Sequence, residues 1–501
     1  MTNRLLDDAW TALTSLDVTP LGDLFASDEG RVARWTRNAS GITFDFSKTH
    51  VTEPFAQGFS AVAAAANYTV KRDALFAGEN VNASEGRAAT HLAERGQGAA
   101  DDNDFAARCH ARMRSLVDAI EGGAFGEIDS ILHIGIGGSA LGPDLVIDAL
   151  GRDADRYDVR VLANIDGEAF DEAVSGLDPA ATLVVGVSKT FTTIETLTNL
   201  DAALSWLSEG GVEDPHGQLI AVTAAPDAAL AYGIDDTRIL PFGEGVGGRY
   251  SLWSTVGLSI ALALGWGAYE ELLEGAGEMD RHVRHDDDNI ALNAAFVDLL
   301  YAQVEGAETR AVFAYDERLR LLPDYLQQLE MESNGKSATA DGAPLARKSA
   351  PITWGGVGTD AQHAVFQLLH QGTHLVPVEF VAVIENDDSM DPRHHALLLG
   401  NCFAQGAALM AGKASDDAAR SYAGNRPSMT LLLDRLDART LGALLSFYEH
   451  RTFANAVLIG INPFDQFGVE LGKEMAKKLD DEAGRASLDP STRALIEKAG
   501  L

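Results

Sequence analysis

The chain has 501 residues, and 46% of them are apolar, which is enough for two or more folded domains with cores of their own. Its 39 lysines and arginines stand against 74 aspartates and glutamates, so the formal net charge is −35. A field of that sign excludes nucleic acid and anionic membrane surfaces as expected partners, and any site for an anionic ligand must be built locally from backbone N–H groups and selected cations.

The cysteines and the N-terminus favour a cytoplasmic protein. Cys109 and Cys402 stand far apart and form no CxxC pair, so the sequence offers no framework of disulfides or zinc ligands. Asp7 and Asp8 interrupt the apolar run that a signal peptide needs. The most apolar stretch, from Val256 to Tyr269, is shorter than a bilayer span, and we interpret it as a buried core helix.

The pattern of apolar residues predicts two sheets. The first hundred residues are expected to be mostly helical, and from Ser130 the chain shows continuous apolar runs of strand length: ILHIGIG, VRVLANID, TLVVGVS and QLIAVTA. A second series begins near Thr309 with TRAVFAYDE, ITWGGVG, HLVPVEFVAVIE and ANAVLIGIN. Such runs are typical of parallel strands buried on both faces by helices. We therefore predict an α/β protein with two doubly wound, mainly parallel sheets and additional N- and C-terminal helices.

The first candidate site is the glycine-rich segment GIGGSALGP, which starts at Gly135 between a predicted strand and a predicted helix. This arrangement presents backbone amides to a phosphate. A dinucleotide site is the alternative, but its fingerprint expects an acidic residue about 20 positions further on. Here the next strand ends at Asp166, thirty-one residues after Gly135, so we favour a phosphate over a dinucleotide.

Two further polar segments follow. SKTFTTIET starts at Ser188, at the carboxyl end of TLVVGVS, where parallel sheets bind ligands. Its hydroxyls, its lysine and the N–H groups of a helix start suit a phosphate dianion, whereas the alternative, a helix N-cap, needs only one hydroxyl. GGRYSLWS places Arg249 after two glycines, where backbone can approach a ligand closely, although Arg249 taken alone could form a structural ion pair.

The segment LPDYLQQLEMESNGKS gathers carboxylates, side-chain amides, an Asn-Gly turn and a lysine within sixteen residues. Gln328 and Glu332 are four apart, so they share a face if residues 325–332 are helical, and the chain should then break at Asn334. A carboxylate at such an end, facing a cleft, can abstract a carbon-bound proton. The alternative is a solvated helix end on which Glu332 pairs with Lys336.

The remaining candidates lie towards the C-terminus. His363 follows WGGVGTDAQ on the first turn of a predicted helix, and histidine is the side chain best able to give and take protons at neutrality, although structural histidines are more common at such positions. In NPFDQFGVELGK, Gln466 and Lys473 are seven apart and would share one helix face, with a solvated face as the alternative. His394 and His395 are adjacent and point apart on a helix, so they predict no metal site.

These motifs resemble those of the phosphoglucose isomerase family, over nearly the whole chain. LPDYLQQLEMESNGKS resembles the motif around the catalytic base, GIGGSALGP the glycine loop and SKTFTTIET the phosphate loop, while GGRYSLWS, FDQFGVELGK, FDFSKTHVT and GENVNASEGRAATHLAERG resemble further signatures. Some positions depart from the family pattern. Ala140 stands where an acid is common, Gly356-Val357 and Asp360-Ala361 replace Glu-Pro and Asn-Gly, and Phe467 replaces a tryptophan.

The resemblance implies reversible isomerisation of glucose 6-phosphate and fructose 6-phosphate, with no cofactor and no metal. It implies that His363 and Lys473 open the sugar ring and that Glu332 then carries a proton between C2 and C1 through a cis-enediol. It gives Arg249 the task of stabilising the intermediate. The substrate-binding residues that we expect on this basis are Gly138, Ser139, Ser188, Lys189, Thr190, Thr193, Gln328 and Gln466.

The resemblance also implies a homodimer, in which His363 reaches the site of the neighbouring subunit. It implies a small sugar-isomerase domain over residues 105–270 and a large one over residues 1–104 and 271–501. Two alternatives stay open. The protein could be a related isomerase that also accepts mannose 6-phosphate, or a non-catalytic sugar-phosphate sensor, which would be expected to lack part of the catalytic set or to carry a basic DNA-binding appendage.

Overall fold

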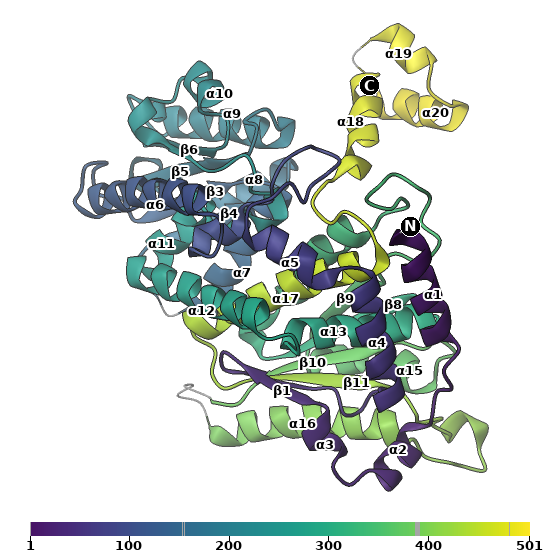
Figure 1. Ribbon diagram of the computed structural model, residues 1–501. Coiled ribbons are helices and arrows are strands. Elements are labelled where there is room, and N and C mark those ends of the chain that lie inside the picture. The colour runs from purple at the N-terminus through teal and green to yellow at the C-terminus, as the bar shows by residue number, and fades with distance from the viewer. Residues whose placement is uncertain (1, 153, 155, 386–390, 480) are drawn as a thin grey trace. The chain divides into compact units, whose positions relative to one another are not determined.

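The computed structural model describes residues 2–152, 154, 156–385, 391–479 and 481–501. By its internal contacts the chain divides into two units, Met1–Pro463 and Phe464–Leu501, and each is described by itself. The first unit contains both β-sheets (Figure 1). In the part of the chain that the structure describes, no helix has both the length and the apolar character needed to cross a bilayer.

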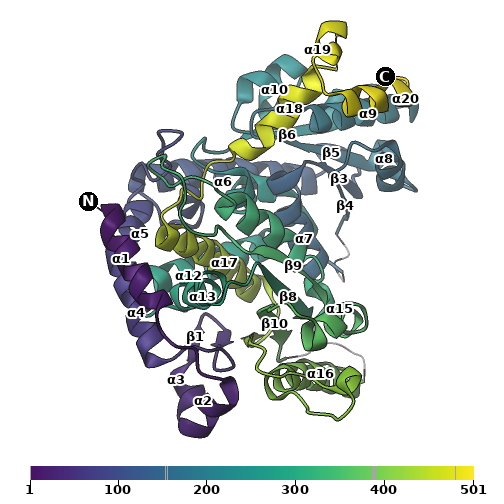
Figure 2. The same cartoon turned by 90° about the vertical axis from the view of Figure 1, so that its right-hand side faces the viewer.

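The first sheet has five parallel strands in the order β4-β3-β5-β6-β7. They are β3 (Ser130–Ile134), β4 (Asp158–Leu162), β5 (Thr182–Val187), β6 (Leu219–Thr223) and β7 (Ile239–Pro241). Every residue of β3, β5 and β6 is buried, because helices cover both faces. One face packs on α8 (Gly167–Val174), α9 (Ile194–Glu209) and α10 (Pro226–Tyr232), and on the other side lie α6 (Ala100–Glu121), α7 (Leu141–Leu150) and α11 (Leu258–Leu264) (Figures 1 and 2).

The second sheet has six strands in the order β1-β2-β11-β10-β8-β9. Its parallel strands are β8 (Thr309–Tyr315), β9 (Ile352–Val357), β10 (Val378–Val383) and β11 (Ser428–Leu433), and the hairpin of β1 (Thr36–Ala39) and β2 (Ile42–Asp45) adds to β11 in antiparallel orientation. Side chains of α15 (Asp360–Gln371) and α16 (Pro392–Ala411) form an apolar core with β8 and β10. On the opposite side lie α13 (Ile290–Leu299) and α17 (Ala438–Ile459) (Figure 2). The predicted α/β class with two mainly parallel sheets is confirmed.

The remaining helices surround these sheets or form the second unit. Within the first unit they are α1 (Thr2–Thr14), α2 (Leu21–Ser27), α3 (Arg31–Arg34), α4 (Glu53–Ala65), α5 (Tyr68–Phe76), α12 (Trp266–His285) and α14 (Leu322–Leu326). The long helix α17 packs along α12 and α13. The second unit consists of α18 (Glu470–Lys477), α19 (Glu482–Ala486) and α20 (Pro490–Ala499) with their connections.

Two predictions about individual elements are wrong. The run ANAVLIGIN, predicted as a strand, completes α17, a helix buried along nearly its whole length. A helix without a solvent-facing side carries the same unbroken apolar run as a buried strand, so the pattern alone does not separate the two. The stretch predicted as one core helix is divided at Gly265, whose φ of 88° breaks α11 from α12.

Candidate active site

Two predicted phosphate-binding segments flank the point where the strand order of the first sheet reverses. From β3 the chain passes to β4 on one side and then to β5 on the other. In open α/β sheets the carboxyl ends of strands at such a reversal form the crevice that binds ligands. The glycine loop follows β3 and the SKTFTT loop follows β5, so the fold brings both to the same crevice.

The hydroxyls of the SKTFTT loop contact one another. Ser188 Oγ lies 3.1 Å from Thr193 Oγ1, and Thr190 Oγ1 lies 2.8 Å from Thr192 Oγ1. Thr193 is the N-cap residue of α9, but its hydroxyl is directed to Ser188 instead of capping the helix. A simple N-cap therefore does not account for the threonines, and their hydroxyls can turn to a phosphate placed at the start of α9.

Lys189 of the same loop is held by backbone carbonyls. Its Nζ donates hydrogen bonds to the carbonyl oxygens of Glu244 and Val246, each over 2.8 Å. Arg87 Nη1 donates to the carbonyl oxygen of Glu244 as well, so two cations converge on one acceptor. Burial, and then the charge of Arg87, lower the pKa of Lys189 to about 8.

Glycines bring three of the predicted segments into contact. A Cβ on Gly138 would lie 2.2 Å from the carbonyl carbon and oxygen of Gly248, so the glycine loop and the segment carrying Arg249 touch backbone to backbone. Gly137 has a φ of 58°, and a Cβ there would lie 2.8 Å from Nε2 of Gln328. Larger residues at these two positions would separate the loops from each other and from Gln328.

His133 is a residue of this region that the sequence reasoning misses. Its Nε2 donates to the carbonyl oxygen of Ser139 over 2.7 Å, and Nδ1 accepts from Ser259 Oγ over 2.8 Å. Burial lowers the pKa of His133 to about 4, which keeps the ring neutral and suits this donor and acceptor arrangement. The signal was the single polar residue within the apolar run ILHIGIG.

Glu332 lies at the end of a helix and forms an ion pair. Helix α14 continues as a π-helix over Gln327–Glu332, and the helical run ends at Asn334, as predicted. Glu332 Oε1 lies 3.2 Å from Nη1 of Arg249, whose side chain is 1% exposed, while that of Glu332 is 18% exposed. The carboxylate thus stands at the boundary between a buried guanidinium and the solvent, and it is not a simple solvated helix end.

Arg249 is fixed on more than one side. Its Nε donates to Ser333 Oγ over 2.6 Å, and its Nη2 donates to the carbonyl oxygen of Pro463. The hydroxyl of Tyr250 lies 3.0 Å from the same Ser333 Oγ. Ser333 is a second residue that the sequence reasoning misses, although its place beside Glu332 could have drawn attention to it. A guanidinium held in this way can stabilise negative charge without reorganising.

Three further predicted residues lie on other elements. His363 lies exposed on the first turn of α15, and among the described residues no hydrogen bond or ion pair joins it to Glu332 or Arg249. Gln466 and Lys473 belong to the second unit. Gln466 is the N-cap residue of the short turn Phe467–Val469, and α18 begins only at Glu470, so the prediction that Gln466 and Lys473 share one helix is wrong.

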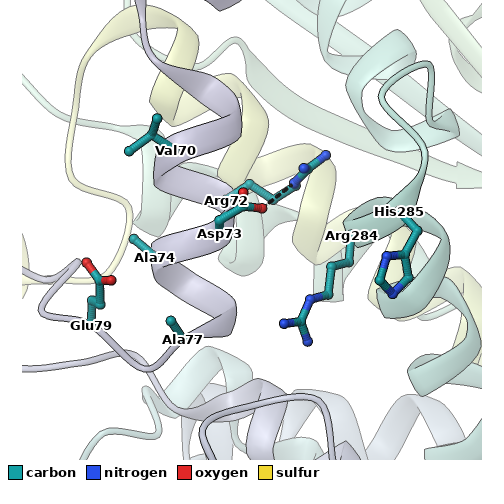
Figure 3. Close-up of a pocket in the computed structure, with 8 residues that line it drawn as sticks. All are labelled: Val70, Arg72, Asp73, Ala74, Ala77, Glu79, Arg284 and His285. Carbon is teal, nitrogen blue, oxygen red and sulfur yellow. Dashed lines mark hydrogen bonds and ion pairs between the residues drawn. The ribbon is translucent and has the colours of Figure 1, made fainter.

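A separate cavity lies between α5 and the end of α12 (Figure 3). Arg72 and Asp73 form an ion pair of 3.1 Å at its edge. The residues that line it are Val70, Arg72, Asp73, Ala74, Ala77, Glu79, Arg284 and His285. None of the side chains predicted to carry chemistry is among them.

Comparisons with known proteins agree over the full chain. The family model described as phosphoglucose isomerase matches residues 45–496. A glucose-6-phosphate isomerase from Rhizorhabdus wittichii is 62% identical over 493 residues, covering 98% of each chain, and one from Zymomonas mobilis is 54% identical over 496 residues, covering 99% of this chain and 98% of the other. The crystal structure of a glucose-6-phosphate isomerase from Chlamydia trachomatis matches with a TM-score of 0.88 at 30% identity, covering 100% of this chain and 98% of that one.

Proposed function

Because the chain belongs to the phosphoglucose isomerase family and is an aldose–ketose isomerase, we propose that it interconverts glucose 6-phosphate and fructose 6-phosphate by proton transfer at Glu332. The observation that carries this proposal is the Glu332–Arg249 pair. A carboxylate at the edge of the solvent lies 3.2 Å from a buried, fixed guanidinium, beside two loops suited to a phosphate. A base, a charge stabiliser and an anchor for the substrate are thus close together.

The proposed reaction proceeds in three steps. Ser139, the SKTFTT loop and its Lys189 hold the phosphate, and Gln328 and Gln466 contact the sugar. His363 and Lys473 open the ring by moving a proton to and from the ring oxygen. Glu332 then removes the proton from C2 while the aldehyde oxygen at C1 takes up a proton from solvent, which gives a cis-enediol. Glu332 returns its proton to C1 as the C2 hydroxyl releases its proton to solvent and becomes a carbonyl. Arg249 stabilises the negative charge that develops on the oxygens between these transfers.

Several accompanying proposals follow from the same family membership. The reaction would serve glycolysis and gluconeogenesis in the cytoplasm. Residues 105–270 would form the small sugar-isomerase domain, and residues 1–104 and 271–501 the large one. The five-stranded sheet, which spans Ser130 to Pro241, supports this division, because the six-stranded sheet is built from the chain on either side of it.

We also propose a homodimer in which His363 serves the partner's site. The support comes from α15 and α16. Helix α16 has twenty residues, of which only Cys402, Gly406 and Leu409 are buried, while Leu397 is 54% and Phe403 47% exposed. An apolar helix face open to water is typical of a surface that another protein covers. The exposed position of His363 on the neighbouring helix α15 fits a side chain directed to a second subunit.

Replacement of Glu332 by glutamine tests the central proposal. Glu332→Gln keeps the shape of the side chain but removes the base, so we expect kcat to fall by at least about 100-fold. Binding of the phosphate group should persist. The measurement is conversion of fructose 6-phosphate to glucose 6-phosphate in the presence of a chelator, coupled to a dehydrogenase, with the exposed Glu317→Gln as the control variant. Near-normal turnover of Glu332→Gln would disprove the assignment, and the same assay with mannose 6-phosphate would reveal a broader substrate range.

A further inference from the structure

Glu330 is a buried carboxylate on the same π-helix as Glu332, and the proposed reaction gives it no task. It is 6% exposed. One of its oxygens, Oε1, accepts a hydrogen bond from Nη2 of Arg310 on β8, and the other, Oε2, accepts one of 2.6 Å from the hydroxyl of Thr353 on β9. The π-helix is therefore attached to two neighbouring strands of the second sheet through a single side chain.

Behind Glu330 lies a cluster of buried charges that holds Arg310 in place. Arg310 Nη1 lies 3.4 Å from Glu379 Oε2 and 3.6 Å from Asp298 Oδ1. Arg451 of α17 pairs with the same two carboxylates. Burial alone would lower the pKa of the Arg310 guanidinium, but the surrounding carboxylates raise it overall, so the arginine stays charged. Moving Arg310 away from these carboxylates would leave buried charges without compensation, so the cluster favours this position of the guanidinium.

The geometry of the helix links this anchor to the base. Residues two apart on a helix point to different sides, so a side chain directed inward at Glu330 leaves Glu332 directed outward. Here Glu330 points to Arg310 and Thr353, and Glu332 points to Arg249. Single π-helical turns are rare, and they occur frequently at functional sites. Here the side chains of Glu330 and Glu332 hold the turn on different sides.

We propose that Glu330 is a positioning residue for the isomerisation: held between Arg310 and Thr353, its carboxylate fixes the rotation of the π-helix and so aims Glu332 at the substrate carbons. This inference rests on the proposed role of Glu332 as the base. Glu330 does not touch the substrate, and it acts only through Glu332. A displacement of the base by about 1 Å is enough to lower a rate about 100-fold.

The test compares substitutions of two buried carboxylates. Glu330→Gln weakens the anchor of the π-helix. Asp280→Asn also removes a buried charge, but Asp280 lies on α12 and contacts Arg95, Ser446 and His450 instead of Arg310. We expect Glu330→Gln to lower kcat by about 10- to 100-fold with KM changed less than about twofold, because the phosphate loops are untouched. Asp280→Asn should keep kcat within about twofold of the unsubstituted enzyme at a similar loss of melting temperature.

A second readout follows the proton itself. When turnover proceeds in D2O, deuterium enters C2 or C1 in proportion to how long the proton remains on the base. A misaimed Glu332 should change this proportion in Glu330→Gln, whereas a loss of stability alone should not. Equal kcat and equal deuterium incorporation in Glu330→Gln and Asp280→Asn would overturn the proposal and leave Glu330 as a purely structural charge.

The neighbouring Thr353 keeps the proposal testable if Glu330→Gln does not fold. Thr353→Val removes only the hydroxyl that holds Oε2 of Glu330, and Thr353→Ser retains it. We expect kcat to fall several-fold in Thr353→Val and to stay near normal in Thr353→Ser; equal activity of the two would overturn the proposal. Failure of the base assignment is a separate result, because it shows as an active Glu332→Gln, whatever the Glu330 and Thr353 variants do.

Discussion

Lys189 is a charged residue of the proposed site whose pKa falls within the pH range of an enzyme assay. Its pKa lies at about 8 because the side chain is buried and because Arg87 is close. Its ammonium donates hydrogen bonds to the uncharged carbonyl oxygens of Glu244 and Val246. The lysine is therefore available to a phosphate dianion, but only while it holds its proton.

We predict that KM for the sugar phosphate rises above pH 8. Below that pH Lys189 is charged, and for each unit above it the charged fraction of the free enzyme falls about tenfold. Lys189→Met should show a higher KM that no longer varies between pH 7 and 9.5. Steady-state kinetics at fixed ionic strength provide the measurement. A KM of the unsubstituted enzyme that is flat across this range would contradict the prediction.

The free energy of unfolding should also depend on the protonation of Lys189. It should rise over the pH range in which substrate affinity falls. The unfolded chain keeps the proton of Lys189 up to about pH 10.5, so between pH 8 and 10.5 it binds more protons than the folded protein. The free energy of unfolding contributed by this residue therefore rises with pH in that window. The comparison of Lys189→Met with the unsubstituted protein isolates this contribution from those of other groups.

At the residue scale the sequence proposes residues but not their contacts. The resemblance of SKTFTTIET and LPDYLQQLEMESNGKS to family motifs pointed to Lys189 and Glu332, and their roles stay predictions. The ion pair of Glu332 with Arg249 joins positions 83 apart in the chain, and no local pattern reports such a distance. Ser333 and His133 were missed for the same reason, because a hydroxyl or an imidazole acquires a task only through the partner that the fold brings to it.

At the scale of elements, the glycine loop and the Arg249 segment approach too closely for a side chain at Gly138. We predict that Gly138→Ala lowers kcat by about 100-fold, because the new Cβ would lie 2.5 Å from the backbone nitrogen of Arg249 and would push the loops apart by about 1 Å. The control is Gly267→Ala on α12, where a Cβ meets nothing within 4 Å. Kinetics and melting temperatures of both variants give the answer, and equal activity in the two would refute the prediction.

Helices and strands were predictable where a sequence pattern is typical of one kind of structure. Strands β3, β5 and β8 appear where continuous apolar runs follow polar turns, because a short segment buried on both faces has few other solutions. The end of α17 was misread because a fully buried helix shows the same run. The hairpin β1–β2 went unnoticed because its strands have only four residues each. The π-helix before Ser333 has no sequence signature that differs from an α-helix.

At the scale of the whole molecule, the composition predicts that the protein repels anionic substrates, so a phosphate site must be built from local groups. With a net charge of −35 the protein repels a sugar phosphate at long range. The groups that we propose to hold the phosphate against this field are backbone amides at the ends of β3 and β5 together with Lys189. The sequence could not predict which surfaces remain uncovered, because burial in a partner depends on the assembled shape and not on the chain alone.

The uncovered face of α16 and the exposed His363 lead to a prediction about two copies of the chain. Suppose that Glu332→Gln and His363→Asn are made in separate chains, each of low activity as a homodimer. If His363 serves the partner's site, a heterodimer of the two carries both substitutions in one site and none in the other. It should then show about half the activity of the unsubstituted dimer. If His363 serves its own subunit, both sites carry one substitution and the heterodimer is as inactive as its parents. Co-expression with two different affinity tags, purification on both, and a coupled assay distinguish the two arrangements, and failure to recover any doubly tagged protein would contradict the dimer itself.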